Sequence, residues 1–285
     1  MGRFINPDNS AFQVALNSPI YVDKTGLLEY TNSVLNTTEA YICNSRPRRF
    51  GKSYAANMLA AYYSKGCNSE EMFLGLDISR ESDFKTHLNK YDVIHLDIQW
   101  FLANCDDVDN VVAFITKSVQ DELREIYPGI FPDEEISLSE CLLRIRNAVG
   151  QKFIVIIDEW DVLIRDEAAN KKVQEKYFNF LRAMFKGSEP TKYIQLAYLT
   201  GILPIKKEKT QTALNNFDEF TMLDAWVMAP YIGFTEVEVR NLCKRYHRDF
   251  EKVKYLYASY LLGDYQVYNP EVIIDVCMQG KFRSY

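Results

Sequence analysis

Short apolar runs alternate along this chain with longer segments of helical spacing. The run at 153–157 has five apolar residues without alternation, which is typical of a strand covered on both faces. Residues 92–98 form a similar strand candidate. Further strands are expected over 39–43, 193–199 and a shorter segment at 219–223. Because helical segments separate these strands, the pattern predicts an α/β fold with a parallel sheet covered by helices on both faces.

Start and stop signals delimit the helices. The segment 106–127 has apolar residues at helical spacing, and Pro128-Gly129 ends it. Ser137 and Glu140 form a capping box that opens a helix through Val149. Other helices are expected over 52–63, 167–185 and 249–262.

The pattern changes after Gly233, where a second capping box and a tyrosine-rich helical segment follow. We therefore expect a core domain over residues 1–230 and a small helical lid over residues 231–285. The chain stops at Tyr285, directly after an apparent helix. This ending predicts that it is a fragment truncated before a further domain.

Composition excludes few classes of protein. The 285 residues are 47% hydrophobic, which is enough for a sizeable core, and the net charge of -6 gives no support for avid binding of nucleic acid or anionic membranes. A local basic patch stays open. Six cysteines without a C-x-x-C pair, and only three histidines, argue against a zinc site. No apolar signal segment or bilayer-long stretch is visible, so a reduced, cytoplasmic protein without membrane contact is expected.

A phosphate-binding loop is predicted between the first strand and its helix. Gly51-Lys52-Ser53 is the ending of the P-loop motif G-x-x-x-x-G-K-[ST], although Arg46 stands in place of the first glycine. Taken alone, this ending is about equally an ordinary glycine turn before a helix. In a P-loop, the amides from Arg48 to Ser53, including those of Arg49, Phe50 and Gly51, would surround phosphate. Lys52 would reach the β- and γ-phosphates, and the Ser53 hydroxyl would bind Mg²⁺.

Two carboxylates end the apolar run at 153–157 and favour the P-loop interpretation. Asp158 would orient Mg²⁺ through water, and Glu159 would polarise the attacking water. Because ligands gather at the carboxyl ends of parallel strands, both motifs are expected at one edge of the sheet. Asp161 is interpreted as a supporting or helix-capping residue. Thr200, which follows the strand at 193–199, is a candidate sensor of the γ-phosphate. Without the other motifs, a strand-ending Thr-Gly would rather indicate an ordinary turn.

Several longer segments resemble the bacterial AAA-ATPase-like family. The most specific is Arg46-Pro-Arg-Arg-Phe-Gly-Lys-Ser53, and Tyr21-Val-Asp-Lys-Thr25 precedes it. The resemblance continues through residues 153–159, 199–205, 213–216, 233–236 and 267–270. Arginine in place of the first P-loop glycine is usual in this family. One difference is Tyr257-Ala-Ser-Tyr260, where members often have Tyr-Asp-Gly-Tyr.

The resemblance implies a P-loop NTPase core that binds ATP and Mg²⁺, commonly fused to a C-terminal PD-(D/E)XK nuclease-like domain. The expected function is Mg²⁺-dependent ATP hydrolysis. The alternative is a nucleotide-binding switch that hydrolyses little and controls a fused or partner nuclease-like module, with nucleic acid reached through that partner.

Self-assembly is a further expectation, because ATPases of this broad class often complete the site with an arginine from a neighbouring subunit. Arg48 and Arg49 in the loop and Arg182 on the helix after the acidic strand are the candidates. Arg48 and Arg49, like Arg46, could equally contact phosphates or face solvent. The basic run at 206–209 is a solvated loop or, as a lesser alternative, a contact for substrate or nucleic acid.

Overall fold

A parallel five-stranded sheet forms the centre of the molecule, in a computed structural model that describes residues 2–131, 136–166, 169–205, 214–280 and 282. The strands are β1 (Tyr41–Ser45), β2 (Asp92–Asp97), β3 (Phe153–Asp158), β4 (Ile194–Gly201) and β5 (Asp218–Phe220). They lie in the order β2-β3-β4-β1-β5. All neighbouring strands are parallel, and β3 lies inside the sheet with only β4 between it and β1. The predicted parallel sheet and its strands are therefore confirmed.

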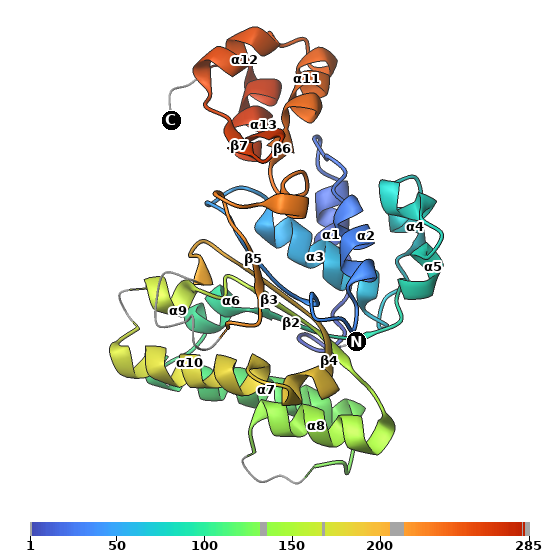
Figure 1. Cartoon of the computed structure of the whole chain (residues 1–285), viewed down its shortest axis with the longest axis vertical. Coiled ribbons are helices and arrows are strands. Elements are labelled where there is room, and N and C mark those ends of the chain that lie inside the picture. Colours follow the sequence, from blue (N-terminus) through green and yellow to red (C-terminus); the bar gives the residue numbers. More distant parts are fainter. Residues whose placement is uncertain (1, 132–135, 167–168, 206–213, 281, 283–285) are drawn as a thin grey trace.

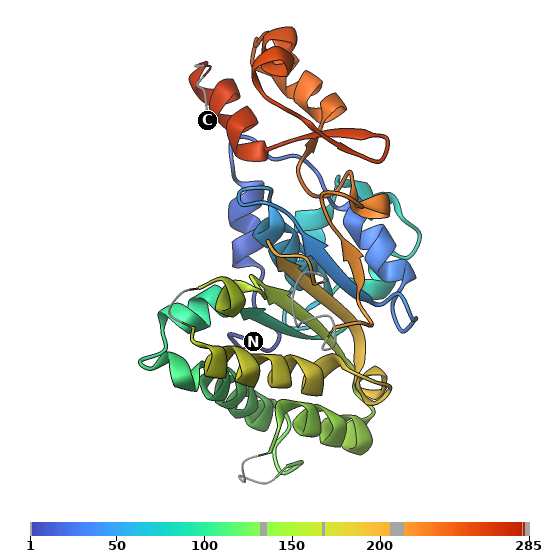
Figure 2. The same cartoon turned by 60° about the vertical axis from the view of Figure 1, so that its left-hand side comes forward.

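Helices cover both faces of this sheet, as predicted (Figures 1 and 2). One face carries α1 (Ser10–Leu16) and α3 (Lys52–Tyr63), and the other carries α7 (Val111–Ile126) and α10 (Lys171–Phe185). The remaining helices of this part are α2 (Gly26–Ser33), α4 (Glu70–Phe73), α5 (Phe84–His87), α6 (Ile98–Ala103), α8 (Leu138–Val149) and α9 (Val162–Arg165). Short 3₁₀ turns lie at Asp77–Arg80, Val108–Asn110, Glu189–Lys192 and Trp226–Met228.

Some observed strands and helices begin or end a few residues away from the predicted positions, and polar residues at these ends explain two of the differences. Strand β1 extends to Asn44 and Ser45, two polar residues that are buried at the carboxyl edge. Helix α10 starts only at Lys171, because the Asn170 side chain caps it by accepting hydrogen bonds from the amides of Lys172 and Val173. The basic run at 206–209 lies outside the described residues.

The C-terminal part contains a small sheet that the sequence analysis missed. Beside α11 (Glu236–Arg245), α12 (Phe250–Leu256) and α13 (Pro270–Gln279), it has an antiparallel sheet in the order β6-β8-β7. Its strands are β6 (Phe234–Thr235), β7 (Tyr260–Leu262) and β8 (Tyr265–Tyr268). The helix predicted over 249–262 is therefore wrong beyond Leu256. Gly263, with φ of +59°, allows the tight turn between β7 and β8 that replaces the last helical turn.

Two hydrophobic clusters underlie this arrangement. The larger surrounds the parallel sheet, and the smaller joins α11, α12 and α13 to Ile20. A partly buried lysine links the segment before α2 to the smaller cluster: Lys24 Nζ lies 2.6 Å from a Glu238 carboxylate oxygen and donates to the Pro230 carbonyl at 2.7 Å. The same Glu238 carboxylate accepts from the Thr235 amide in the capping box, as predicted for this segment. The division into domains at residue 230 stays a prediction.

Two features bear on the predicted environment of the protein. All six cysteines are free thiols. Among the described residues, no helix combines the length and the apolar character that crossing a membrane requires.

We predict that Gly233→Ala destabilises the protein more than Gly187→Ala does. Both glycines have left-handed backbones, with φ of +99° and +88°, so alanine is strained at either position. A Cβ at Gly233 would also lie 2.5 Å from Val267 Cγ1, whereas nothing lies within 4 Å at Gly187. We expect losses of roughly 2–4 kcal/mol and about 1 kcal/mol, respectively. Thermal unfolding measures both, and equal midpoints for the two variants would contradict the predicted clash.

Candidate nucleotide-binding site

The loop from Arg46 to Gly51 connects β1 to α3 and has the geometry of a phosphate cradle. Gly51 adopts φ of +89° immediately before the helix, a conformation that disfavours any side chain. None of the described side chains caps α3, so the amides of its first turn are available to an anion. Lys52 begins the helix and donates to the Pro47 carbonyl at 3.1 Å, within the loop. The exposed Ser53 follows it.

Arg46, which replaces the first glycine of the motif, supports the loop from beneath. Its side chain is buried, and Nη1 donates to the carbonyls of Ser45 at 3.0 Å and Phe220 at 2.9 Å. Its amide donates to the Gly201 carbonyl at 3.0 Å. Burial lowers the pKa of this guanidinium to about 10. Arg46 therefore joins β1 to β4 and β5, and does not face solvent.

A row of polar side chains crosses the carboxyl edge of the sheet at one register position. Asn44 lies opposite Thr200, and Asp97 lies opposite Asp158. Because Ile157 pairs with Leu199, Asp158 and Thr200 are the next neighbours along β3 and β4. Thr200 Oγ1 and Asn44 Oδ1 are buried and have no hydrogen-bond partner among the described residues.

The sequence analysis missed Asn44 and Asp97. The end of the predicted strand at 92–98 was a signal for Asp97, because carboxyl ends of parallel strands meet at one edge. Nothing marked Asn44 until its register with Thr200 was known.

Asp158 is a buried carboxylate that forms no ion pair within the part of the chain that the structure describes. Burial is the main cause that raises the pKa of Asp158 from 3.8 to about 6, with smaller contributions from the charges of Asp97 and Glu159. The Ser53 hydroxyl, which hydrogen-bonds the carboxylate, opposes this rise in pKa. A carboxylate in this setting would gain from a bound cation that keeps it ionised.

Glu159 faces the phosphate loop from the end of β3. Its backbone is left-handed, with φ of +51°, which is uncommon for a residue other than glycine. Its Oε1 lies 3.9 Å from Lys52 Nζ, and its Oε2 accepts a hydrogen bond from Arg165 Nη2. Burial lowers the pKa of Lys52, and the charge of Glu159 is the largest opposing effect. The two motifs that the sequence placed about a hundred residues apart thus meet at one edge.

Asp161 supports this edge without contacting the loop. Its Oδ2 accepts from the amides of Ile202 at 3.1 Å and Leu203 at 2.7 Å, and from Arg165 Nε at 2.8 Å. Asp161 therefore holds the turn that follows Thr200, which agrees with the interpretation of a supporting residue.

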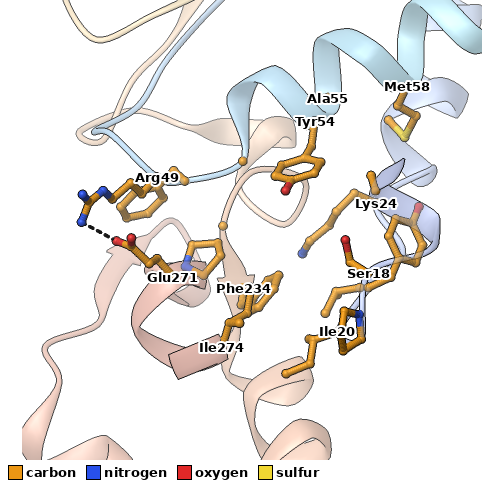
Figure 3. A pocket seen from close by; sticks show the side chains of 18 of the residues that line it. Ser18, Ile20, Lys24, Arg49, Tyr54, Ala55, Met58, Phe234, Glu271 and Ile274 are labelled. Carbon is orange, nitrogen blue, oxygen red and sulfur yellow. Dashed lines mark hydrogen bonds and ion pairs between the residues drawn. The ribbon is translucent and has the colours of Figure 1, made fainter. Parts of the chain in front are cut away.

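A cavity of about 620 Å³ opens beside Gly51, between the N-terminal segment, α3 and the C-terminal part (Figure 3). Its walls are mainly apolar and include Ile20, Met58, Phe234 and Ile274. The volume lies within the range of small-molecule sites.

The phosphate loop and the C-terminal part touch at the rim of this cavity. Arg49 Nη1 pairs with a Glu271 carboxylate oxygen at 2.7 Å, and the rings of Phe50 and Tyr260 lie 5.6 Å apart. Arg48 is exposed, and Arg182 Nη1, on α10, donates to Asn179 at 2.8 Å.

The residues at this edge fit a magnesium nucleotide. The left-handed glycine and uncapped helix suit phosphate, the Ser53 hydroxyl and Asp158 carboxylate are oxygen donors of the kind Mg²⁺ prefers, and the adjoining cavity suits a nucleoside. Within the described ranges, no three His, Cys, Asp or Glu side chains cluster as a metal site. Mg²⁺ commonly takes only one or two protein ligands and completes its shell with phosphate oxygens and water.

The parallel sheet, the loop from β1 into α3 and the acidic end of β3 together define a P-loop NTPase fold. A family model described as predicted AAA-ATPase matches residues 11–210, which is more than half of the chain. The chain belongs to this AAA-ATPase-like family, as the sequence motifs predicted.

The chain is also similar to one curated protein in sequence and to several solved structures in fold. An uncharacterized protein in the vnfD 5' region of Azotobacter chroococcum mcd 1 is 23% identical over 272 residues, covering 93% of this chain and 49% of that protein. The chain thus spans about half the length of this curated relative. Among solved structures, Aeropyrum pernix ORC1 in complex with DNA has 11% identity and a TM-score of 0.42, over 86% of this chain and 54% of that one. Aeropyrum pernix ORC2, in ADPNP-ADP complexes, has 10% identity and a TM-score of 0.39, over 78% and 49%.

We predict that Asp158→Asn stabilises the nucleotide-free protein above pH 6. Because the folded-state pKa of about 6 lies above 3.8, the folded protein binds this proton more tightly than the unfolded chain. The free energy of unfolding therefore falls as the pH rises from about 4 to about 6. Removing the charge should add on the order of 1–3 kcal/mol at pH 8 and almost nothing at pH 4.

Thermal unfolding in EDTA across this pH range measures the effect. Asp249→Asn is the matched control, because Asp249 caps α12 at an exposed position and asparagine caps equally well. A stability difference for Asp158→Asn that is constant between pH 4 and pH 8 would contradict the prediction.

Proposed function

We propose that this protein binds ATP with Mg²⁺ and hydrolyses it. The observation that carries the proposal is the approach of Lys52 Nζ to within 3.9 Å of Glu159 Oε1 across the mouth of the phosphate loop. A phosphate-binding cation and a carboxylate able to activate water thus share one site. The choice of ATP over GTP rests on membership of the AAA-ATPase-like family.

Each motif residue has a separate role in this proposal. Lys52 and the amides from Arg48 to Ser53 bind the phosphates, and Ser53 and Asp158 hold the metal ion, Asp158 through water. Bound Mg²⁺ would neutralise charge on the phosphate oxygens. Glu159 takes a proton from the attacking water, and the Thr200 hydroxyl donates to the γ-phosphate.

Unpaired atoms and the cavity support these assignments. Thr200 Oγ1 is buried and has no partner among the described residues, so its donor is free for a ligand. The cavity beside Gly51 would hold the nucleoside, with its apolar walls excluding water from the base.

We predict that Lys52→Ala and Glu159→Gln fail at different steps. Lys52→Ala should weaken ATP binding at least tenfold, because a charged phosphate contact is lost. Glu159→Gln should bind ATP about as well as the wild type and hydrolyse it roughly 100-fold more slowly or worse, because the base is removed. Calorimetric binding and phosphate release measure the two steps.

The exposed pair Lys192–Glu189 provides matched controls with the same chemistry away from the site. Lys192→Ala and Glu189→Gln should bind and hydrolyse like the wild type. Equal phosphate release from the wild type, Lys52→Ala and Glu159→Gln would refute the proposed ATPase.

A nucleotide switch with little hydrolysis is the second candidate, favoured by the contacts between the phosphate loop and the C-terminal part. Arg49–Glu271 and Phe50–Tyr260 give a bound phosphate a route to move that part, and through it a nuclease-like module or nucleic acid on a partner. Tight ATP binding with negligible turnover, even with DNA added, would select this function. A reducing, cytoplasmic setting suits either function, because all six thiols are free.

We predict that ATPase activity per molecule rises with protein concentration, because a neighbouring subunit supplies an arginine to the γ-phosphate. The exposed Arg48 is one candidate, together with Arg49 and Arg182. Phosphate release at a series of protein concentrations, with light scattering in ATP and Mg²⁺, measures rate and mass together. Constant specific activity with a monomeric mass would exclude self-assembly as the trigger.

A further inference from the structure

The two oxygens of the Glu159 carboxylate have different neighbours. Oε1 faces the phosphate loop, 3.9 Å from Lys52 Nζ, and Oε2 accepts from Arg165 Nη2. One oxygen is therefore anchored while the other is directed toward the proposed site of hydrolysis. The left-handed backbone of Glu159 needs such support, because residues other than glycine persist there only when their surroundings hold them.

Arg165 is itself held in place. It is the last residue of α9, and its Nε donates to Asp161 Oδ2 at 2.8 Å while Nη2 reaches Glu159. Asp161 is fully buried, so its carboxylate offers the guanidinium a fixed partner. Two nitrogens of one planar group thus each contact a carboxylate, a fixed geometry that the single nitrogen of a lysine ammonium on its flexible stem does not reproduce.

The same carboxylate of Asp161 connects Arg165 to the end of β4. It accepts from the amides of Ile202 and Leu203, directly after the strand that carries Thr200. Asp161 also packs tightly against the backbone of Gly201, where an added Cβ would lie 2.6 Å from Asp161 Oδ1. Arg165 therefore joins the ends of β3 and β4 at the side of the sheet that faces the phosphate loop.

We propose that Arg165 is a positioning residue for hydrolysis, which holds the Glu159 carboxylate toward the γ-phosphate and aligns it with the turn after Thr200. This inference rests on the proposed ATPase function. When Lys52 turns to bound phosphate, Glu159 loses its nearest contact in the loop and keeps Arg165. The role requires Arg165 to affect the rate of the chemical step and to leave nucleotide binding unchanged, because its hydrogen bonds within the described part of the chain go to Asp161 and Glu159 and not to the phosphate loop.

The test compares Arg165→Ala and Arg165→Lys with the wild type. We expect Arg165→Ala to lower kcat on the order of tenfold to a hundredfold, as a misplaced catalytic group does, with KM and the Kd of a non-hydrolysable ATP analogue within about twofold. Arg165→Lys keeps the charge but loses the planar group whose two nitrogens reach Asp161 and Glu159 separately, so kcat should recover only in part.

Arg144→Ala is the matched control. Arg144 Nε contacts Glu140, four residues earlier, at 2.7 Å, as Arg165 Nε contacts Asp161 at 2.8 Å, but on α8, away from the site. This variant should match the wild type in kcat, KM and Kd.

The outcomes separate this inference from the proposed function. A wild type that hydrolyses no ATP refutes the function and the positioning role with it. An active wild type with an equally active Arg165→Ala refutes the positioning role alone, as does a parallel loss of binding and turnover. If Arg165→Ala does not fold, Arg165→Lys decides: several-fold lower kcat at unchanged Kd supports the role, and wild-type kcat overturns it.

Discussion

The register between parallel strands is the constraint on which the site depends. Pairing of Asn44 with Thr200 and of Asp97 with Asp158 aligns four polar side chains at one edge of the sheet. A shift of one residue in any strand would turn its side chain to the opposite face. Both β3 and β4 are buried along their whole length, so side-chain packing on both faces of the sheet holds this register. Packing of the core therefore determines where the chemistry lies.

Burial of charge at this edge comes at a cost in stability. Asp158 and Lys52 are both buried. Burial raises the pKa of Asp158 and lowers the pKa of Lys52, and both shifts favour the neutral form of the side chain. Arg46 adds a third buried ionisable group, with Nε and Nη2 unpartnered among the described residues. Such costs concentrate at functional sites, because groups prepared for a ligand cannot also be fully satisfied without it. A bound magnesium nucleotide would supply the missing partners and so stabilise the folded protein.

The sequence predicted the sheet and the two motif-bearing strand ends because those features are local. Five apolar residues before Asp158, and a glycine before Lys52, signal their structures without reference to the rest of the chain. The contacts of Arg165 and the register of Asn44 depend on tertiary packing, so no local pattern indicated them. The strand at Tyr260–Leu262 was missed for another reason: Tyr260 continues the helical spacing of Tyr255 and Tyr257, and the turn at Gly263 was not recognised.

The hydrogen bonds of Arg46 explain how an arginine takes the place of the first glycine of the phosphate loop. A buried arginine beneath the loop fixes its entry by bonds to Ser45 and Phe220. The first position of the loop is thereby held by a buried side chain, while Arg49 and Gly51 further along have left-handed backbones, with φ of +69° and +89°. Arg49 is then directed outward to Glu271. The loop is therefore anchored at its entry by Arg46 and joined to α13 by Arg49.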